Sequence, residues 1–151
     1  MQIGDILKPF KAIDQDGNEF DMTQLIGQKP LVIYFYPKNF TPGCTKEACD
    51  FRDNNQDFVD LGAEVIGISA DSEKSHHRFA TKYKLPFTLI TDANGTIRRQ
   101  FGVKKNLLGL LPGRETFVFD KHGVLVHRHN SMDARSHIRK ALKEVKALSE
   151  S

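Results

Sequence analysis

The chain has 151 residues, of which 39% are hydrophobic and 27% are charged. This size and composition predict a single globular domain over residues 1–151, because a chain of this length can bury roughly two-thirds of its unfolded surface in one core. The net charge of +3 comes without a basic block interleaved with aromatic residues, which argues against a nucleic-acid partner.

No segment of the sequence has the length and apolar character of a membrane span, so no membrane partner is expected. The first residues lack the basic region and apolar stretch of a secretory signal. We therefore expect a cytoplasmic location.

The first third of the chain alternates turn signals with apolar runs. Residues 10–20 contain an Asp-Gly pair and predict a hairpin, and residues 21–25 predict a short helical turn. Residues 31–36 are continuously apolar or aromatic, which is typical of a buried strand. Pro37 ends this strand.

A helix is expected to follow this strand. Thr41 is a good N-cap residue, and Pro42 suits the first helical position. The apolar spacing continues to Leu61, and Gly62 ends the helix. Cys44 is then about the third helical residue, where the helix dipole favours a thiolate.

The rest of the chain repeats the alternation of strand and helix and ends in a hairpin and a helix. The expected elements are a strand at 64–70, a helix at 72–83 capped by Asp71 or Ser72, a strand at 87–90, one or two helical turns at 96–101, a loop at 104–113, strands at 115–119 and 124–128, and a final helix capped by Asp133. This order predicts the α/β class, with parallel strands joined by crossover helices. A thioredoxin-like fold fits it: a central mixed β-sheet flanked by helices, with an N-terminal hairpin.

The two cysteines, Cys44 and Cys49, carry the chemistry that the sequence offers. Cysteines of a cytosolic protein are more often catalytic or redox-active than structural. Their Cys-x4-Cys spacing differs from the Cys-x-x-Cys of a dithiol or zinc site. His76-His77 and His127/His129 have spacings that can bind a metal, but we interpret them as surface histidines. We expect neither a metal nor another cofactor.

The segment around Cys44 resembles a known family. Pro37-x-x-x-Thr41-x-x-Cys44 has the form of the peroxiredoxin active-site motif, and the surrounding run Tyr34-Phe-Tyr-Pro-Lys and Thr-Pro-Gly-Cys-Thr-x-Glu-Ala-Cys49 is similar to the PrxQ or bacterioferritin-comigratory-protein branch. Further matches lie at residues 67–71, 87–92, 107–120 and His137-Ile138. The match at residues 107–120 is more similar to cyanobacterial and plastid members than to enterobacterial ones. The resemblance covers nearly the whole chain.

The resemblance implies a thioredoxin-fold peroxidase without metal or haem that reduces hydrogen peroxide and organic hydroperoxides. Cys44 matches the peroxidatic cysteine and Cys49 the resolving cysteine, with an intrachain disulfide that a thioredoxin-like donor reduces. Thr41 and Arg114 match the other two active-site positions, and Pro37 matches the proline that shields the sulfur from water. The chain lacks the C-terminal cysteine of an inter-subunit disulfide, so we expect a monomer.

Peroxide cleavage explains why these residue types are needed. We expect the permanently charged guanidinium of Arg114 to stabilise both the Cys44 thiolate and the departing oxyanion. The Thr41 hydroxyl is expected to accept the backbone N–H of Cys44 and to donate to peroxide, while Gly43 leaves room for the substrate. Glu47 has two interpretations, a solvated helix residue or a residue that orients Arg114.

Helix geometry adds a conformational expectation. Five residues along a helix separate the Cα atoms of Cys44 and Cys49 by about 8.6 Å, whereas a disulfide tolerates at most about 7 Å. The first turns must therefore unwind on oxidation. Cys49 has the alternative of being an ordinary buried cysteine, with an external thiol resolving Cys44. A peroxide sensor or relay protein and a thiol–disulfide oxidoreductase remain as rival functions.

Overall fold

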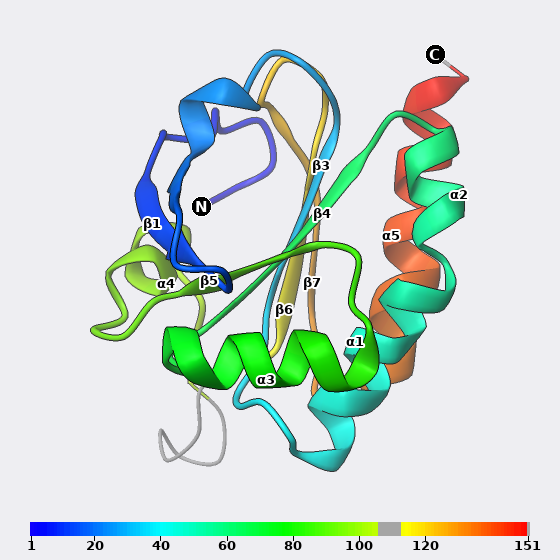
Figure 1. Ribbon diagram of the computed structural model, residues 1–151. Coiled ribbons are helices and arrows are strands. Elements are labelled where there is room, and N and C mark those ends of the chain that lie inside the picture. The colour runs from blue at the N-terminus through cyan, green and yellow to red at the C-terminus, as the bar shows by residue number, and fades with distance from the viewer. Residues whose placement is uncertain (106–112, 151) are drawn as a thin grey trace.

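The computed structural model describes residues 1–105 and 113–150 of the chain. Its strands form one seven-stranded sheet in the order β2-β1-β5-β4-β3-β6-β7 (Figure 1). The strands are β1 (Lys11–Asp14), β2 (Glu19–Asp21), β3 (Leu31–Phe35), β4 (Glu64–Ser69), β5 (Thr88–Thr91), β6 (Glu115–Phe119) and β7 (Leu125–Asn130). The helices are η1 (Met22–Gln24), α1 (Pro42–Asp53), α2 (Asn55–Asp60), α3 (Glu73–Tyr83), α4 (Thr96–Phe101) and α5 (Ala134–Ser149).

The centre of the sheet is parallel and its edges are antiparallel. β3 pairs with β4, and β4 with β5, in parallel. Helices α1 and α2 connect the first pair, and α3 connects the second. β6 runs antiparallel to β3, and the β1–β2 hairpin joins the other side through β5. This arrangement confirms the predicted thioredoxin-like α/β fold with its N-terminal hairpin.

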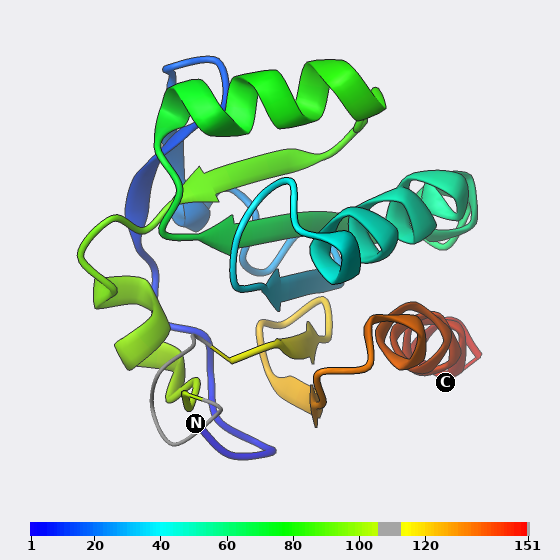
Figure 2. The same cartoon turned by 90° about the horizontal axis from the view of Figure 1, so that it is seen from below.

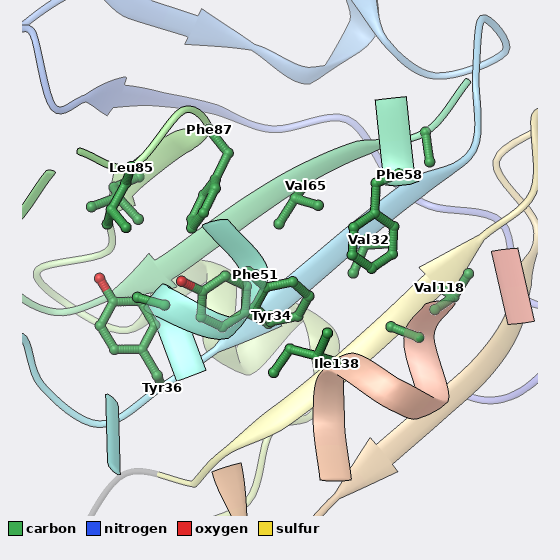
Figure 3. Packing of buried hydrophobic residues seen from close by; sticks show 14 of the residues in the cluster. Val32, Tyr34, Tyr36, Phe51, Phe58, Val65, Leu85, Phe87, Val118 and Ile138 are labelled. Carbon is green, nitrogen blue, oxygen red and sulfur yellow. The ribbon is translucent and has the colours of Figure 1, made fainter. Parts of the chain in front are cut away.

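Two apolar cores lie on opposite faces of the sheet because side chains of β3 alternate between them. Val32, Tyr34 and Tyr36 face a core that α1, α2, α3 and α5 cover, and Figure 3 shows Phe51 of α1 and Ile138 of α5 among its side chains. Leu31 and its alternate neighbours face the second core, which contains buried residues of the N-terminal segment, η1 and α4. Figure 2 shows α1 and α5 side by side, away from α4.

The single helix expected over residues 42–61 is in fact two helices, α1 and α2, so the prediction of one continuous helix was wrong. Asn54 has φ −104° and ψ 6°, outside the helical region, and it separates α1 from α2. Its side-chain amide donates to the Asp50 carbonyl at 2.8 Å. Asparagine competes with helical bonding in this way, and the continuous apolar spacing concealed the break.

The other helix ends follow the sequence signals. Of the two candidate caps for α3, Ser72 accepts from the backbone N–H of Ser75, and Asp133 accepts from the N–H of Arg135 at the start of α5. Most of the loop expected at 104–113 lies outside the described residues. Within the described part of the chain, no helix is long and apolar enough to cross a bilayer.

Candidate active site

Cys44 lies where the central strand β3 leads into α1. It is the third residue of α1, and its side chain is 1% exposed. The first backbone bond within the helix runs from Thr45 N–H to the Thr41 carbonyl at 2.9 Å. The N–H groups of Gly43 and Cys44 precede this bond, so they point out of the positive end of the helix dipole. A thiolate is favoured in this position.

Arg114 reaches the same place from the other end of the sequence. β6 runs antiparallel to β3 with Glu115 opposite Phe35, so the residue before β6 lies beside the end of β3. The Arg114 side chain is almost fully buried, and its Nη2 donates to the Cys44 sulfur at 3.4 Å. The fold thus brings together two predicted site residues that are 70 positions apart.

Glu47 binds the other arm of this guanidinium. Arg114 Nη1 donates to Glu47 Oε1 at 2.6 Å, and the Glu47 side chain is 0% exposed. The solvated interpretation of Glu47 is therefore wrong. Burial raises the pKa of Glu47 to about 8, although Arg114 opposes the shift. Burial also lowers the pKa of Arg114, but the nearby Glu47 and Cys44 outweigh it and leave that pKa above the ordinary value.

His137 of α5 lies behind Glu47 and was not predicted as a site residue. Its Nδ1 is 2.7 Å from Thr116 Oγ1 and 3.6 Å from Glu47 Oε2, and its Nε2 is 2.7 Å from the Ser131 carbonyl oxygen. The ring is fully buried, and burial lowers the pKa of His137 to about 4. One signal was present in the sequence, because His137 falls on the apolar stripe of the final helix.

The predicted hydrogen bond from the Cys44 N–H to the Thr41 hydroxyl is wrong. Thr41 is the N-cap of α1, as expected, but its hydroxyl makes no cap bond to a helix N–H. The hydroxyl donates instead to the Lys38 carbonyl at 2.8 Å. Thr41 is therefore held by the preceding loop, and it lies only three residues before Cys44. Pro37 is half-buried at the beginning of that loop.

Asn39 anchors this loop to the rest of the protein, and sequence reasoning missed it. Its backbone N–H donates to Asp71 Oδ2 at 2.9 Å, and its side-chain nitrogen lies 2.9 Å from Nδ1 of His76. Phe40, the next residue, has a φ of 66°, an uncommon value for a residue with a side chain. The loop before α1 is thus fixed in one conformation.

The prediction of a surface histidine at position 76 was wrong. His76 is 0% exposed, and its Nε2 lies 3.1 Å from the Ile90 carbonyl, which only accepts. Nε2 therefore carries the proton and Nδ1 accepts from Asn39. Burial lowers the pKa of His76, which keeps the ring neutral. In residues 1–105 and 113–150, no group of three or more histidine, cysteine or acidic side chains is arranged to hold a metal.

Gly43 allows the close approach of Arg114. A Cβ atom at this position would lie 2.9 Å from Arg114 Nη2, closer than such atoms normally approach. The backbone of Gly43 does not have a positive φ, so alanine fits the helix itself. The absence of a side chain here serves the guanidinium.

We expect Gly43→Ala to lower the rate of peroxide reduction about 10-fold or more, because displacing a catalytic group by about 1 Å has effects of this size. Thermal stability should stay level or rise, since alanine is the better helix former. Stopped-flow oxidation and thermal unfolding measure the two effects. The exposed Lys46→Ala on the same helix is the control, and a Gly43→Ala rate equal to the control contradicts this role.

Cys49 lies in the same helix as Cys44. Both are free thiols, Cys44 buried and Cys49 half-buried. Both belong to the continuous helix α1, so the sulfurs cannot join while its first turns are intact.

A buried sulfur at a helix start, contacted by a buried guanidinium on a thioredoxin-like sheet, defines a thiol-based redox enzyme. A family model described as the AhpC/TSA family matches residues 3–128. The chloroplastic peroxiredoxin Q of Sedum lineare is 50% identical over 93% of this chain and 75% of that protein. Its namesake from Gentiana triflora is 49% identical over 93% of this chain and 64% of that protein.

Solved structures agree with these relatives. Peroxidoxin BcpB from Mycobacterium tuberculosis has a TM-score of 0.87 and 40% identity, with 98% of each chain covered. The bacterioferritin comigratory protein of Xanthomonas campestris, described with an alkyl peroxide reduction activity, has a TM-score of 0.85 and 33% identity, covering 93% of this chain and 92% of that one. The chain belongs to the AhpC/TSA family, as a peroxiredoxin of the Q type. It is a thiol-dependent peroxidase, which confirms the resemblance found in the sequence.

Proposed function

We propose that Cys44 is the sulfur that attacks peroxide and that Arg114 is its main electrostatic partner. The observation that carries this assignment is the 3.4 Å contact from Arg114 Nη2 to the Cys44 sulfur inside a buried site. The thiolate attacks the terminal peroxide oxygen, so an S–O bond forms while the O–O bond breaks. The electron pair of the O–O bond leaves with the second oxygen, which takes a proton to become water or an alcohol, and Cys44 becomes a sulfenic acid.

Thiolate formation alone does not make an efficient peroxidase. An ordinary thiol is a few per cent ionised near pH 7, so full ionisation gains at most roughly thirtyfold. The rest must come from groups that bind the transition state more tightly than the substrate. Arg114 and the N–H groups of Gly43 and Cys44 supply positive charge where the oxyanion develops. The Thr41 hydroxyl beside this helix start donates to the Lys38 carbonyl, so it is placed to accept a hydrogen bond from the peroxide O–H. Pro37 limits the access of water.

The proposed substrates are hydrogen peroxide and organic hydroperoxides. Attack on the terminal oxygen requires the same O–O geometry in both classes, and the activity named for the Xanthomonas campestris protein concerns alkyl peroxides. A site of this kind on one chain needs no second subunit, which supports a monomer.

We further propose that Cys49 resolves the sulfenic acid. Its thiol attacks the Cys44 sulfur, water leaves, and an intrachain disulfide forms. A thioredoxin-like dithiol then reduces this disulfide. Because turnover requires repeated reduction, the proposed location is a reducing compartment such as the cytoplasm.

A coupled assay tests these assignments. With peroxide, thioredoxin, its reductase and NADPH, we expect sustained NADPH oxidation by the wild type and none by Cys44→Ser. In Cys49→Ser, one equivalent of peroxide should leave a persistent sulfenic acid on Cys44, measured by mass spectrometry, and turnover with thioredoxin should stop.

Each other outcome has a distinct meaning. Unaltered turnover by Cys49→Ser refutes resolution by Cys49. Stoichiometric oxidation of the wild type without turnover favours a peroxide sensor. Activity of Cys44→Ser excludes Cys44 as the attacking sulfur.

A further inference from the structure

Behind the guanidinium lies a buried carboxyl oxygen that the peroxidase mechanism does not use. Glu47 Oε1 accepts from Arg114, but Oε2 has no hydrogen-bond partner among the described residues and is fully buried. Nδ1 of His137 lies 3.6 Å from this oxygen. A buried polar atom without a partner is costly, so this arrangement calls for a physical explanation.

The hydrogen bonds of His137 fix its tautomer. Nε2 lies 2.7 Å from the Ser131 carbonyl oxygen, which only accepts, so Nε2 carries a proton. In the neutral ring Nδ1 is then an acceptor, and the Thr116 hydroxyl at 2.7 Å is placed to donate to it. An ionised Glu47 would therefore set two lone pairs against each other across the 3.6 Å gap. One more proton between Glu47 and His137 removes this conflict.

The charges of the site lead to the same requirement. A thiolate on Cys44, the Arg114 cation and an ionised Glu47 would leave one uncompensated negative charge in a buried cluster. Isolated buried charges are strongly unfavourable. With one proton shared by Glu47 and His137, the pair is uncharged as a whole, and the thiolate and guanidinium compensate each other.

We propose that His137 is a positioning residue of the peroxidase reaction, which together with Glu47 holds one buried proton and so leaves the charge of Arg114 to the Cys44 thiolate. The inference rests on the proposed role of Cys44. When the pair loses its proton, the Glu47 carboxylate competes with the sulfur and with the departing oxyanion for Arg114. Peroxide reduction then slows.

The surroundings favour Glu47 as the resting place of this proton. Burial raises the pKa of Glu47 to about 8 and lowers that of His137 to about 4, and Arg114 and His129 oppose a second positive charge nearby. The ring of His129 lies 4.6 Å from that of His137, and burial lowers its pKa as well. Among the described residues, the charged and titratable groups that interact with the pair come from several elements: Asp50 of α1, Tyr34 of β3 and Tyr36 after it, Arg114 before β6, His129 of β7 and Asp133 at the start of α5. Cys44 acts on the pair through its contact with Arg114.

The pH dependence of two variants tests the proposal. In the wild type, the second-order rate constant for Cys44 oxidation by hydrogen peroxide should fall above about pH 8 with a single ionisation. Glu47→Gln, which is neutral at every pH, should lose this alkaline fall. His137→Gln keeps a polar side chain but cannot take up the proton, so the fall should move to lower pH. If the midpoint of this fall moves down by about one pH unit in His137→Gln, its rate near pH 8 is about fivefold lower than that of the wild type.

His127→Gln is the control, because His127 is a half-buried histidine on this side of the sheet that contacts Glu144 and not Glu47. Its profile should match the wild type. A wild-type rate that does not fall up to pH 9, an alkaline fall that persists in Glu47→Gln, or a uniform loss in His137→Gln without a displaced profile overturns the proposal.

A second measurement does not depend on peroxidase activity. In the Cys49→Ser background, the ultraviolet absorbance of the Cys44 thiolate can be titrated without peroxide. With His137→Gln added, the thiolate absorbance should appear at higher pH than in the background protein, because an ionised Glu47 competes with the sulfur for Arg114. An unchanged titration contradicts the proposal. If peroxide reduction is absent in the wild type while this titration shifts, the proposed function fails and the proton-holding pair stands.

Discussion

Arg114→Lys is expected to lower the second-order rate constant for peroxide reduction about 10²–10³-fold, the usual effect of removing a donor that stabilises an oxyanion. One arm of the guanidinium donates to the Cys44 sulfur and the other to Glu47. An ammonium is a single point charge, so it cannot hold both contacts in one plane. Stopped-flow measurement of the first oxidation isolates this step from recycling.

Arg128→Lys is the control, because it makes the same substitution in an arginine that lies outside the active site. Arg128 also pairs with a buried carboxylate, donating to Glu115 Oε2 at 2.6 Å, but it does not contact the sulfur. Its peroxide rate should stay near that of the wild type, and thermal unfolding should verify that both variants fold. Equal rates for the two variants would show that Arg114 does not act on the transition state.

The sequence predicted the elements well because their signals are local. The strand at 31–36, the cap at Asp71 or Ser72, the cap at Asp133 and the hairpin turns depend on residues within a few positions of one another. The break at Asn54 escaped prediction because the apolar spacing continues through it. A side-chain bond to Asp50 outweighs this spacing, and only the folded chain shows it.

The site was predictable where a motif carried it and unpredictable where it depends on contacts between distant elements. Cys44 and Arg114 were found through the family motif. Glu47 is buried because it lies on the same face of α1 as Cys44 and Phe51. In the sequence of α1 alone, a charged residue on this face suggests exposure to solvent. His137 became part of the site only because α5 packs beside α1. Neither helix reveals that neighbour in its own sequence.

Oxidation by one equivalent of peroxide is expected to increase amide hydrogen exchange in the first turns of α1 about 10²-fold or more, because local opening removes most of the protection of a native helix. In α1 the Cα atoms of Cys44 and Cys49 are about 8.6 Å apart by helix geometry, and a disulfide accepts at most about 7 Å. Mass spectrometry of exchanged peptides covering residues 42–52 measures the change. Cys49→Ser should keep its protection after the same treatment, because a sulfenic acid alone does not require unwinding.

The unwinding should stop before the end of α1, because its last turn is held by contacts that the disulfide does not disturb. The ring of Phe51 stacks on Tyr34 at 4.5 Å and is fully buried, and Arg52 Nη1 donates to the Tyr83 carbonyl at 2.8 Å. Exposing such an aromatic side chain costs about 1.5–3 kcal/mol, whereas closing the disulfide needs only the turns between the two cysteines. Exchange should therefore rise most at residues 43–49 and little in α2 or α5. Equal protection of residues 42–52 in the reduced and oxidised states would show that the two sulfurs do not join.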